Sequence, residues 1–337
     1  MIGVVEITAW HWIGFVCAVL VLLGLDLGYF HRRAHSVSFK EALGWTAVWI
    51  CLALVFAAGL GHFRGRKESL EFITGYLIEL SLSMDNVFVI ALIFGYFQIP
   101  AKHQHRVLFW GILGALVMRG FMIGIGVAII SVLHWILWVL GAFLVLSGIK
   151  MLVATTEVEP ERNPVIRWVR KFYPVTPHLE GQKFLTVWNG RIALTPLALV
   201  LVMVETTDLV FAIDSIPAIF AVTRNAFIVF TSNVFAILGL RTLYFVLAGA
   251  IGYFRYLKYG LSMVLVIIGI KMLLDPHDRE PPLWFQVDIP ITVSLLLVAG
   301  IIVLSIVLSI VAGWREKRRS PPHHSDPPPK PDTTSEP

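Results

Sequence analysis

Residues 291–313 read I-T-V-S-L-L-L-V-A-G-I-I-V-L-S-I-V-L-S-I-V-A-G, and no charged side chain interrupts them. As a helix rising about 1.5 Å per residue, this segment would be about 35 Å long. The hydrocarbon core of a bilayer is about 30 Å thick, so one such helix crosses it. The segment therefore predicts a transmembrane helix, and the same pattern recurs along the chain.

The composition of the whole chain agrees with a membrane protein. Of its 337 residues, 57% are hydrophobic and 15% are charged, and the mean hydropathy is +0.78. That is too little charge to cover the surface of a soluble protein. No basic segment precedes the first apolar run, and Arg32 and Arg33 follow it, which indicates a retained helix and not a cleaved signal. We expect an all-α, polytopic transmembrane bundle of about nine helices, at residues 8–30, 41–60, 70–95, 107–130, 134–153, 192–220, 226–251, 258–274 and 290–314.

The Lys and Arg residues are distributed unevenly between the two sides of this bundle. If the C-terminus is cytoplasmic, 18 of them lie in inside segments and five lie outside. Positive charge favours the cytoplasmic side, so we expect the N-terminus outside and the C-terminus inside. Within the basic 154–191 loop, Arg162–Phe172 mixes aromatic and basic residues. Two interpretations stay open for it, a short helix on the anionic leaflet and a solvated loop.

Two segments of the chain resemble each other. S-M-D-N-V-F-V-I at 83–90 aligns with T-T-D-L-V-F-A-I at 206–213, so Asp85 falls on Asp208. Arg119 falls near Arg241, and G-I-K-M-L occurs at both 148–152 and 269–273. The matches are collinear, and a three-helix unit re-enters the membrane from the opposite face, as in the inverted repeats of secondary transporters. The chain then divides into two N-terminal helices (1–69), a first repeat (70–153), a cytoplasmic basic loop (154–191), a second repeat (192–274), a last helix (275–314) and a disordered, Pro-rich cytoplasmic tail (315–337).

Charged residues inside the predicted helices are the strongest sign of function. A central carboxylate costs roughly 2.5–3.5 kcal/mol to insert, so each needs a partner, a proton or a bound cation. Five carboxylates face two arginines, which leaves a deficit of three positive charges if all are ionised. Oxygen ligands suit Mg²⁺, Ca²⁺ or Mn²⁺, and thioethers at Met84 and Met203 would favour Mn²⁺. The predicted metal ligands are Glu79, Asp85, Asn86, Glu205, Asp208 and Asp214, with Arg119 and Arg241 compensating charge. The alternative is a purely structural polar network.

Helical spacing places some of these groups together. Glu79, Ser83 and Asn86 share one face of an ideal helix, and Glu205 and Asp208 are neighbours. Asp85 and Asp214 fall on neither face. Pro217 cannot donate to the carbonyl of Ile213, so we expect a break or kink that frees carbonyl ligands beside Asp214.

Several chemistries are disfavoured. The chain has no P-loop motif and no H-E-x-x-H motif, and we expect neither an enzyme nor a permanently bound cofactor. No histidine falls in the middle of a predicted helix, which argues against haem. Cys17 and Cys51 are too few for a disulfide framework or a four-Cys site, and we expect them to be buried. The net charge of +5 is explained by the orientation of the chain in the membrane, so we expect no nucleic-acid partner.

The acidic segments E-L-S-L-S-M-D-N-V-F at 79–88 and E-T-T-D-L-V-F-A-I-D-S-I-P-A at 205–218 resemble the TerC family, especially its Alx-type branch. The likeness covers roughly residues 8–314 and includes L-D-L-G-Y-F-H at 25–31. It implies bacterial inner-membrane proteins, first named for tellurium resistance, and manganese efflux in the Alx-type branch. Asp26 matches a family aspartate. It either joins the metal path or is an interfacial carboxylate beside Arg32 and Arg33.

Two functions of different classes follow. The first is a secondary transporter that exports a divalent cation, Mn²⁺ before others, driven by an ion gradient in which protons on the surplus carboxylates take part. The second is a non-transporting membrane scaffold in a tellurite-resistance or envelope-stress complex, with the basic loop as its working part. A redox protein is disfavoured because histidine and cysteine ligands are missing.

Overall fold

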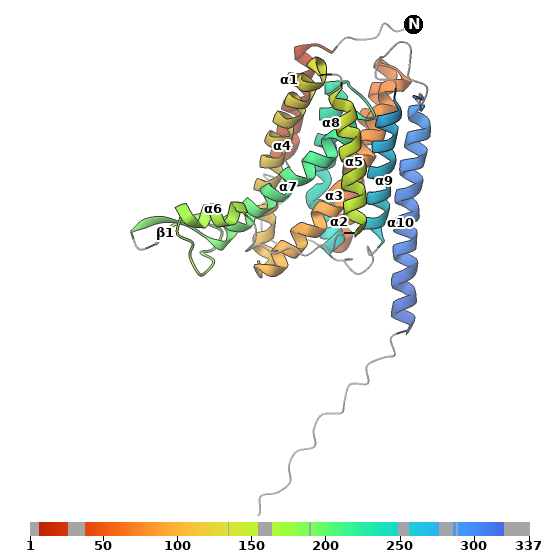
Figure 1. Ribbon diagram of the computed structural model, residues 1–337. Coiled ribbons are helices and arrows are strands. Elements are labelled where there is room, and N and C mark those ends of the chain that lie inside the picture. The colour runs from red at the N-terminus through yellow and green to blue at the C-terminus, as the bar shows by residue number, and fades with distance from the viewer. Residues whose placement is uncertain are drawn as a thin grey trace, which may run out of the picture.

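The computed structural model describes residues 7–25, 38–133, 135–153, 164–188, 190–248, 256–275, 286–287 and 289–319. Over this part of the chain, long helices form a bundle, and a short helix with a hairpin projects sideways near one end (Figure 1). The elements in chain order are α1 (Ala9–Leu25), α2 (Phe39–Phe63), α3 (Arg66–Tyr96), α4 (Ala101–Val132), α5 (Ile136–Val153), α6 (Pro164–Phe172), β1 (Leu185–Trp188), β2 (Arg191–Leu194), α7 (Pro196–Phe220), α8 (Ala226–Ala248), α9 (Leu257–Leu274) and α10 (Ile291–Arg319).

The predicted all-α membrane bundle is confirmed. Among the described residues, seven helices are long and apolar enough to cross a membrane: α2, α3, α4, α5, α7, α8 and α10. The apolar helix α1 has 17 residues and α9 has 18. The count of nine crossings stays a prediction.

Local sequence signals set where the helices begin. The hydroxyl of Ser38 accepts a hydrogen bond from the Glu41 amide, and that of Thr195 accepts one from the Ala198 amide. Such caps satisfy amide groups that the first turn of a helix leaves free. Pro196 follows Thr195 at the first helical position, where a proline loses no hydrogen bond. Between α2 and α3 the chain turns at Gly65, whose φ of 104° suits a residue without a Cβ.

The centre of the bundle consists of α3 and α8, and α7 and α4 pack beside them. Of the membrane-length helices, α8 is the most deeply buried, and it packs on α3, α2 and α4. Beside this centre, α5 and α9 pack at very close range. A Cβ on Gly148 would lie 2.8 Å from the Ser262 carbonyl oxygen, and one on Gly269 would lie 2.8 Å from that of Gly141. The glycines therefore let the two backbones touch.

The helix contacts fit the predicted repeat. In that scheme α3 corresponds to α7, α4 to α8 and α5 to α9. A two-fold axis that exchanges the repeats would relate the contact between α3 and α8 to a contact between α7 and α4. Both contacts are present in the structure. The contacts α3–α7, α4–α8 and α5–α9 map onto themselves and also exist. This is the pairing expected of two repeats around a two-fold axis, although the repeat itself stays a prediction.

The structure differs from three expectations about the chain. The 154–191 segment is more than a loop, since it contains α6 and β1, and β2 begins at its end. The last helix continues to Arg319, so residues 315–319 are helical and do not belong to a disordered tail. Residues 320–337 lie outside the described part. Cys17 and Cys51 are exposed on the outer surface of the bundle, so the expectation that they are buried is wrong.

The expected break at Pro217 is wrong, whereas a kink there, with a freed Ile213 carbonyl, stays a prediction. Helix α7 continues through Pro217 to Phe220, and its last turns close with bonds from Ala221 to Pro217 and from Thr223 to Ile219. A proline one turn from the end of a helix removes one hydrogen bond and leaves the remainder of the helix intact.

Candidate functional site

Arg119 is the centre of a polar network inside the bundle. Its side chain, near the middle of α4, is 2% exposed. The guanidinium donates two hydrogen bonds to the carboxylate of Asp208 in α7, from Nη2 to Oδ1 over 2.7 Å and from Nε to Oδ2 over 3.1 Å. Such a two-pronged contact fixes the relative orientation of both groups. It joins α4 to α7 inside the bundle.

The same guanidinium binds a second acid. Its Nη1 forms an ion pair with Glu79 of α3, which is fully buried. Asn233 of α8 donates from Nδ2 to the other Glu79 oxygen over 3.1 Å and accepts from Arg119 over 3.1 Å. The hydroxyl of Ser215 in α7 lies 3.4 Å from Nη1. Side chains of α3, α4, α7 and α8 thus meet in one buried cluster.

The charges of this cluster do not balance. With both acids ionised, Glu79 and Asp208 face the single guanidinium of Arg119, which leaves one surplus negative charge. A buried unbalanced charge is unfavourable unless a proton or a cation compensates it. The cluster is therefore chemically suited to take up a positive charge.

Asn86 of α3 completes the cluster and leaves an oxygen free. Its Nδ2 donates to Asp208 Oδ1 over 2.8 Å, whereas its Oδ1 has no hydrogen-bond partner among the described residues. Ser83 Oγ, one turn earlier, also lacks a partner there, and both side chains are 1% exposed. Buried polar atoms in proteins normally have partners, so these two oxygens are candidates to bind a ligand or water.

A small cavity adjoins Asn86 and Asp208. Its volume is about 10 Å³. About one water molecule or one bare cation fits such a space. Its other walls are apolar, formed by Ile90, Leu108, Gly111, Ile112, Ala115, Val204, Ile237 and Leu240.

Glu205 lies one turn before Asp208 and packs against α4. Its carboxylate occupies the space that a Cβ on Gly114 would fill. The glycine thus makes room for an acid that is half-buried next to the cluster. Glu205 and Asp208 lie on one side of α7, as the spacing predicted.

The structure places the remaining predicted residues as follows. Asp214 accepts a hydrogen bond from Ser147 of α5 over 2.9 Å. Asp85 is half-buried, and among the described residues no hydrogen bond or ion pair joins it to Asp208. Arg241 is buried in α8, and Asp26 lies outside the described residues. Nor does the described part hold a group of three His, Cys, Asp or Glu side chains placed to bind a metal.

The sequence interpretation missed two members of the cluster, Asn233 and Ser215. A signal existed for the first, because an asparagine in the middle of an apolar helix is itself costly. Ser215 carries no such signal, since a serine can bond to its own helix backbone anywhere.

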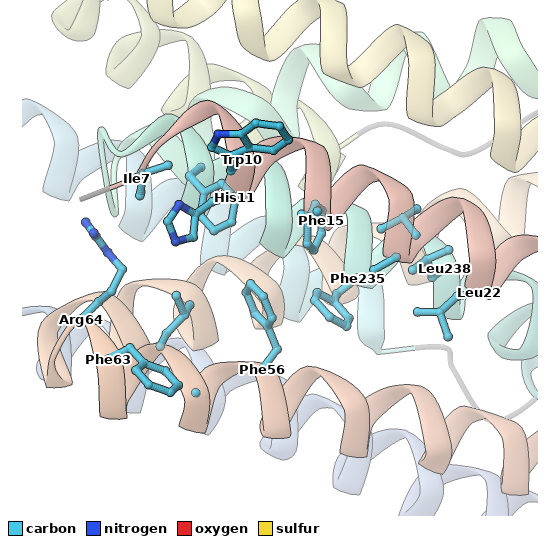
Figure 2. A pocket seen from close by; sticks show the side chains of 16 residues that line it. Ile7, Trp10, His11, Phe15, Leu22, Phe56, Phe63, Arg64, Phe235 and Leu238 are labelled. Atoms are coloured by element: carbon cyan, nitrogen blue, oxygen red, sulfur yellow. The ribbon is translucent and has the colours of Figure 1, made fainter. Parts of the chain in front are cut away.

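A larger pocket lies elsewhere in the described part of the chain. Figure 2 shows it between α1, α2 and α8, and its volume is about 670 Å³. Its walls are almost entirely apolar, with Phe15, Phe56 and Phe235 at its centre and His11 and Arg64 at one end. Arg64 is paired with Glu68 over 2.7 Å. None of the predicted metal ligands lines this pocket, so size alone does not mark the candidate ion site.

Comparison with known proteins identifies a family for this chain. The family described as "Integral membrane protein TerC family" matches residues 64–320, a range that contains every member of the cluster. No solved structure matches the chain.

Relatives match over almost their whole length. The membrane protein STKORF319 of Myxococcus xanthus is 52% identical over 301 residues, which cover 89% of this chain and 92% of that protein. A protein of Escherichia coli (strain K12), whose name describes a membrane-bound redox modulator, Alx, is 44% identical over 317 residues, covering 91% of this chain and 96% of the relative. A membrane protein of Rickettsia bellii is 40% identical over 287 residues, covering 85% and 94%. The chain therefore belongs to the TerC family of integral membrane proteins.

Proposed function

We propose that this protein is a secondary transporter that exports a divalent metal cation, Mn²⁺ before others, across the bacterial inner membrane. The observation that supports this best is the position of Asp208. Its buried carboxylate lies between Arg119 and Asn86, beside a cavity of ionic size and two unpartnered oxygens. The surplus negative charge there favours a cation.

In this proposal Arg119 occupies the place of the cation when the site is empty. Its guanidinium neutralises Asp208 and Glu79 while no metal is bound. An entering divalent ion brings two positive charges and takes the carboxylate oxygens, together with Asn86 Oδ1 and Ser83 Oγ, as ligands. Hard divalent cations prefer such oxygen sets. Arg119 must then swing away, which couples ion binding to a movement between α4 and α7.

The choice of Mn²⁺ rests on softer ligands nearby and on the family. Met203 of α7 is buried in an apolar cluster, and Met84 of α3 packs against that cluster. A thioether favours Mn²⁺ over Mg²⁺ or Ca²⁺, because manganese is the softer ion. The other predicted acids, Asp85, Glu205 and Asp214, would line the path or carry the coupling protons.

The proposed orientation places the N-terminus outside and the C-terminus in the cytoplasm. The Lys and Arg residues support it through their bias to one side. Figure 1 adds that α6 with its hairpin and the C-terminal end of α10, both in segments assigned to the cytoplasm, lie toward the same end of the bundle.

The redox name of several relatives fits this proposal indirectly. Manganese is a redox-active metal, so a protein that controls its concentration also affects the redox balance of the cell. The two thiols of the chain, Cys17 and Cys51, lie on α1 and α2 outside the polar cluster, and the proposal gives them no role.

Cellular metal content tests the proposed function. Cells lacking the protein, loaded with manganese, should accumulate more of it than the parent strain, and a plasmid copy should restore the parental level. Zinc and copper contents should not change, because those ions prefer thiolate or imidazole ligands. Equal manganese in all strains would contradict export and leave the scaffold alternative.

A further inference from the structure

A folded arm projects from the side of the bundle. It comprises residues 164–195, with α6 followed by the hairpin of β1 and β2, and Figure 1 shows it extending outward next to the start of α7. Ile166 is buried and belongs to an apolar cluster that includes Leu197 and Leu199 of α7. From α4, Arg106 lies over the ring of Phe184 at 5.1 Å. The arm is therefore fixed to the bundle.

The outer face of α6 combines aromatic and basic side chains. Trp168 and Phe172 are 62% and 59% exposed, and their rings lie side by side with centroids 4.8 Å apart. Arg167 and Lys171 are also exposed, on the neighbouring strip of the helix. Buried Ile166 and half-buried Val169 face the other way. An exposed aromatic strip flanked by basic residues is typical of helices that lie in a membrane surface.

The hairpin also exposes an apolar face. Leu185 pairs with Leu194 and Val187 with Ile192, so all four side chains lie on one face of the ribbon. Leu185, Val187 and Ile192 are 57%, 72% and 62% exposed. A two-stranded hairpin is at best marginally stable in water, and an exposed apolar patch of this kind marks a contact surface.

The charge of the arm identifies its partner. Residues 164–195 contain five basic residues, Arg167, Arg170, Lys171, Lys183 and Arg191, and one acid, Glu180. Anionic lipid headgroups attract basic residues near the membrane surface. Figure 1 shows the arm extending sideways from one end of the bundle, where a bilayer around the transmembrane helices would have its surface.

We propose that the arm lies on the anionic headgroup region of the bilayer, with Trp168, Phe172 and the apolar face of the hairpin inserted between the lipids. The chain passes directly from β2 through Thr195 into α7, the helix that carries Asp208. The arm therefore anchors the start of this helix to one leaflet. This inference concerns the position of the arm and does not depend on metal export.

Fluorescence quenching in nanodiscs tests the proposal with the full-length protein. In a background with Cys17 and Cys51 replaced by alanine, an environment-sensitive fluorophore is attached at Val187→Cys or at Trp168→Cys. A label at Val293→Cys, an exposed position at the start of the apolar helix α10, is the control for contact with lipid near the headgroups. Lipids carrying a nitroxide near the headgroup should quench both arm labels. That quenching should fall severalfold when phosphatidylglycerol is replaced by phosphatidylcholine, whereas the α10 label should respond equally in both lipids.

A variant of the arm with reversed charge provides a second test. Arg167→Glu with Lys171→Glu should abolish quenching at position 187 in anionic nanodiscs and leave the α10 label unchanged. Quenching at neither arm position, while the α10 label is quenched, would overturn the proposal. Labels shielded from aqueous iodide but not reached by lipid nitroxides would also overturn it, since a second copy or another protein would then cover the arm.

Discussion

Arg119 holds Asp208 through two hydrogen bonds of 2.7 and 3.1 Å while the same guanidinium pairs with Glu79. One cation thus joins acids from the two halves of the predicted repeat, Glu79 in α3 and Asp208 in α7. Ion pairs of this kind can stabilise the fold, and a metal ion can also replace the arginine in them. A structural role and a transport role predict different effects when Arg119 or Asp208 is substituted.

The first prediction concerns the stability of this pair. Arg119→Gln leaves two buried acids without their cation, and breaking one side of a buried ion pair destabilises a protein by about 3–5 kcal/mol. We expect a clearly lower melting temperature for purified Arg119→Gln in detergent. Adding Asp208→Asn should recover much of the loss, because the two residues interact directly. Losses that simply add in the double mutant would show that the pair is not coupled.

The second prediction concerns the close packing of α5 on α9. At Gly148→Ala the new Cβ would lie 2.7 Å from Val266 Cγ2 and 2.8 Å from the Ser262 carbonyl oxygen, and a backbone atom cannot move aside easily. Overpacking of this kind typically costs about 1–3 kcal/mol. The control is Gly124→Ala in α4, where no atom lies within 4 Å of the added methyl group. The melting temperature should fall in Gly148→Ala and stay unchanged in Gly124→Ala. Equal melting temperatures of the two variants would contradict the close contact between the backbones of α5 and α9.

The third prediction concerns orientation. With Cys17 and Cys51 replaced by alanine, a membrane-impermeant thiol reagent should label Lys67→Cys in intact spheroplasts. Gln182→Cys, exposed in the arm, should react only after lysis. Labelling of position 182 from outside would reverse the topology and place the arm on the outer leaflet.

The fourth prediction concerns Asp85, which the repeat pairs with Asp208. If both acids serve one ion path, Asp85→Asn should abolish manganese export although the two carboxylates are not in contact in this structure. The double mutant Asp85→Asn/Asp208→Asn should be no worse than either single mutant. Export at half rate in each single mutant would instead indicate two independent paths.

Much of the fold could be predicted because long apolar segments permit little else in a membrane. Helix α10, with no charge from Ile291 to Ala312, is the clearest case. The hairpin was missed since its strands have four residues each and lie in a basic, Pro-containing segment. The break expected at Pro217 did not occur, because one turn of helix follows this proline and its remaining hydrogen bonds close normally.

The candidate site was predictable in its residue types and less so in its pairing. An acid or an arginine in an apolar helix needs compensation wherever it lies, so Glu79, Asp208 and Arg119 could be selected from sequence. Which acid pairs with which arginine depends on the rotation of each helix about its axis. The repeat suggested equal roles for Asp85 and Asp208, whereas in the structure Asp208, and not Asp85, is paired with Arg119.

Metal flux through the purified protein tests the central claim most directly. Proteoliposomes containing wild-type protein, with a manganese-sensitive dye inside, should take up Mn²⁺ down its gradient. Asp208→Asn should abolish this flux while the protein still inserts at normal levels, because loss of one negative charge weakens a divalent site steeply in a low dielectric. The matched control, Glu68→Gln, removes a carboxylate from the Arg64 pair at the start of α3 and should transport normally. Flux through Asp208→Asn equal to that of the wild type and of Glu68→Gln would contradict the account and make the buried network purely structural.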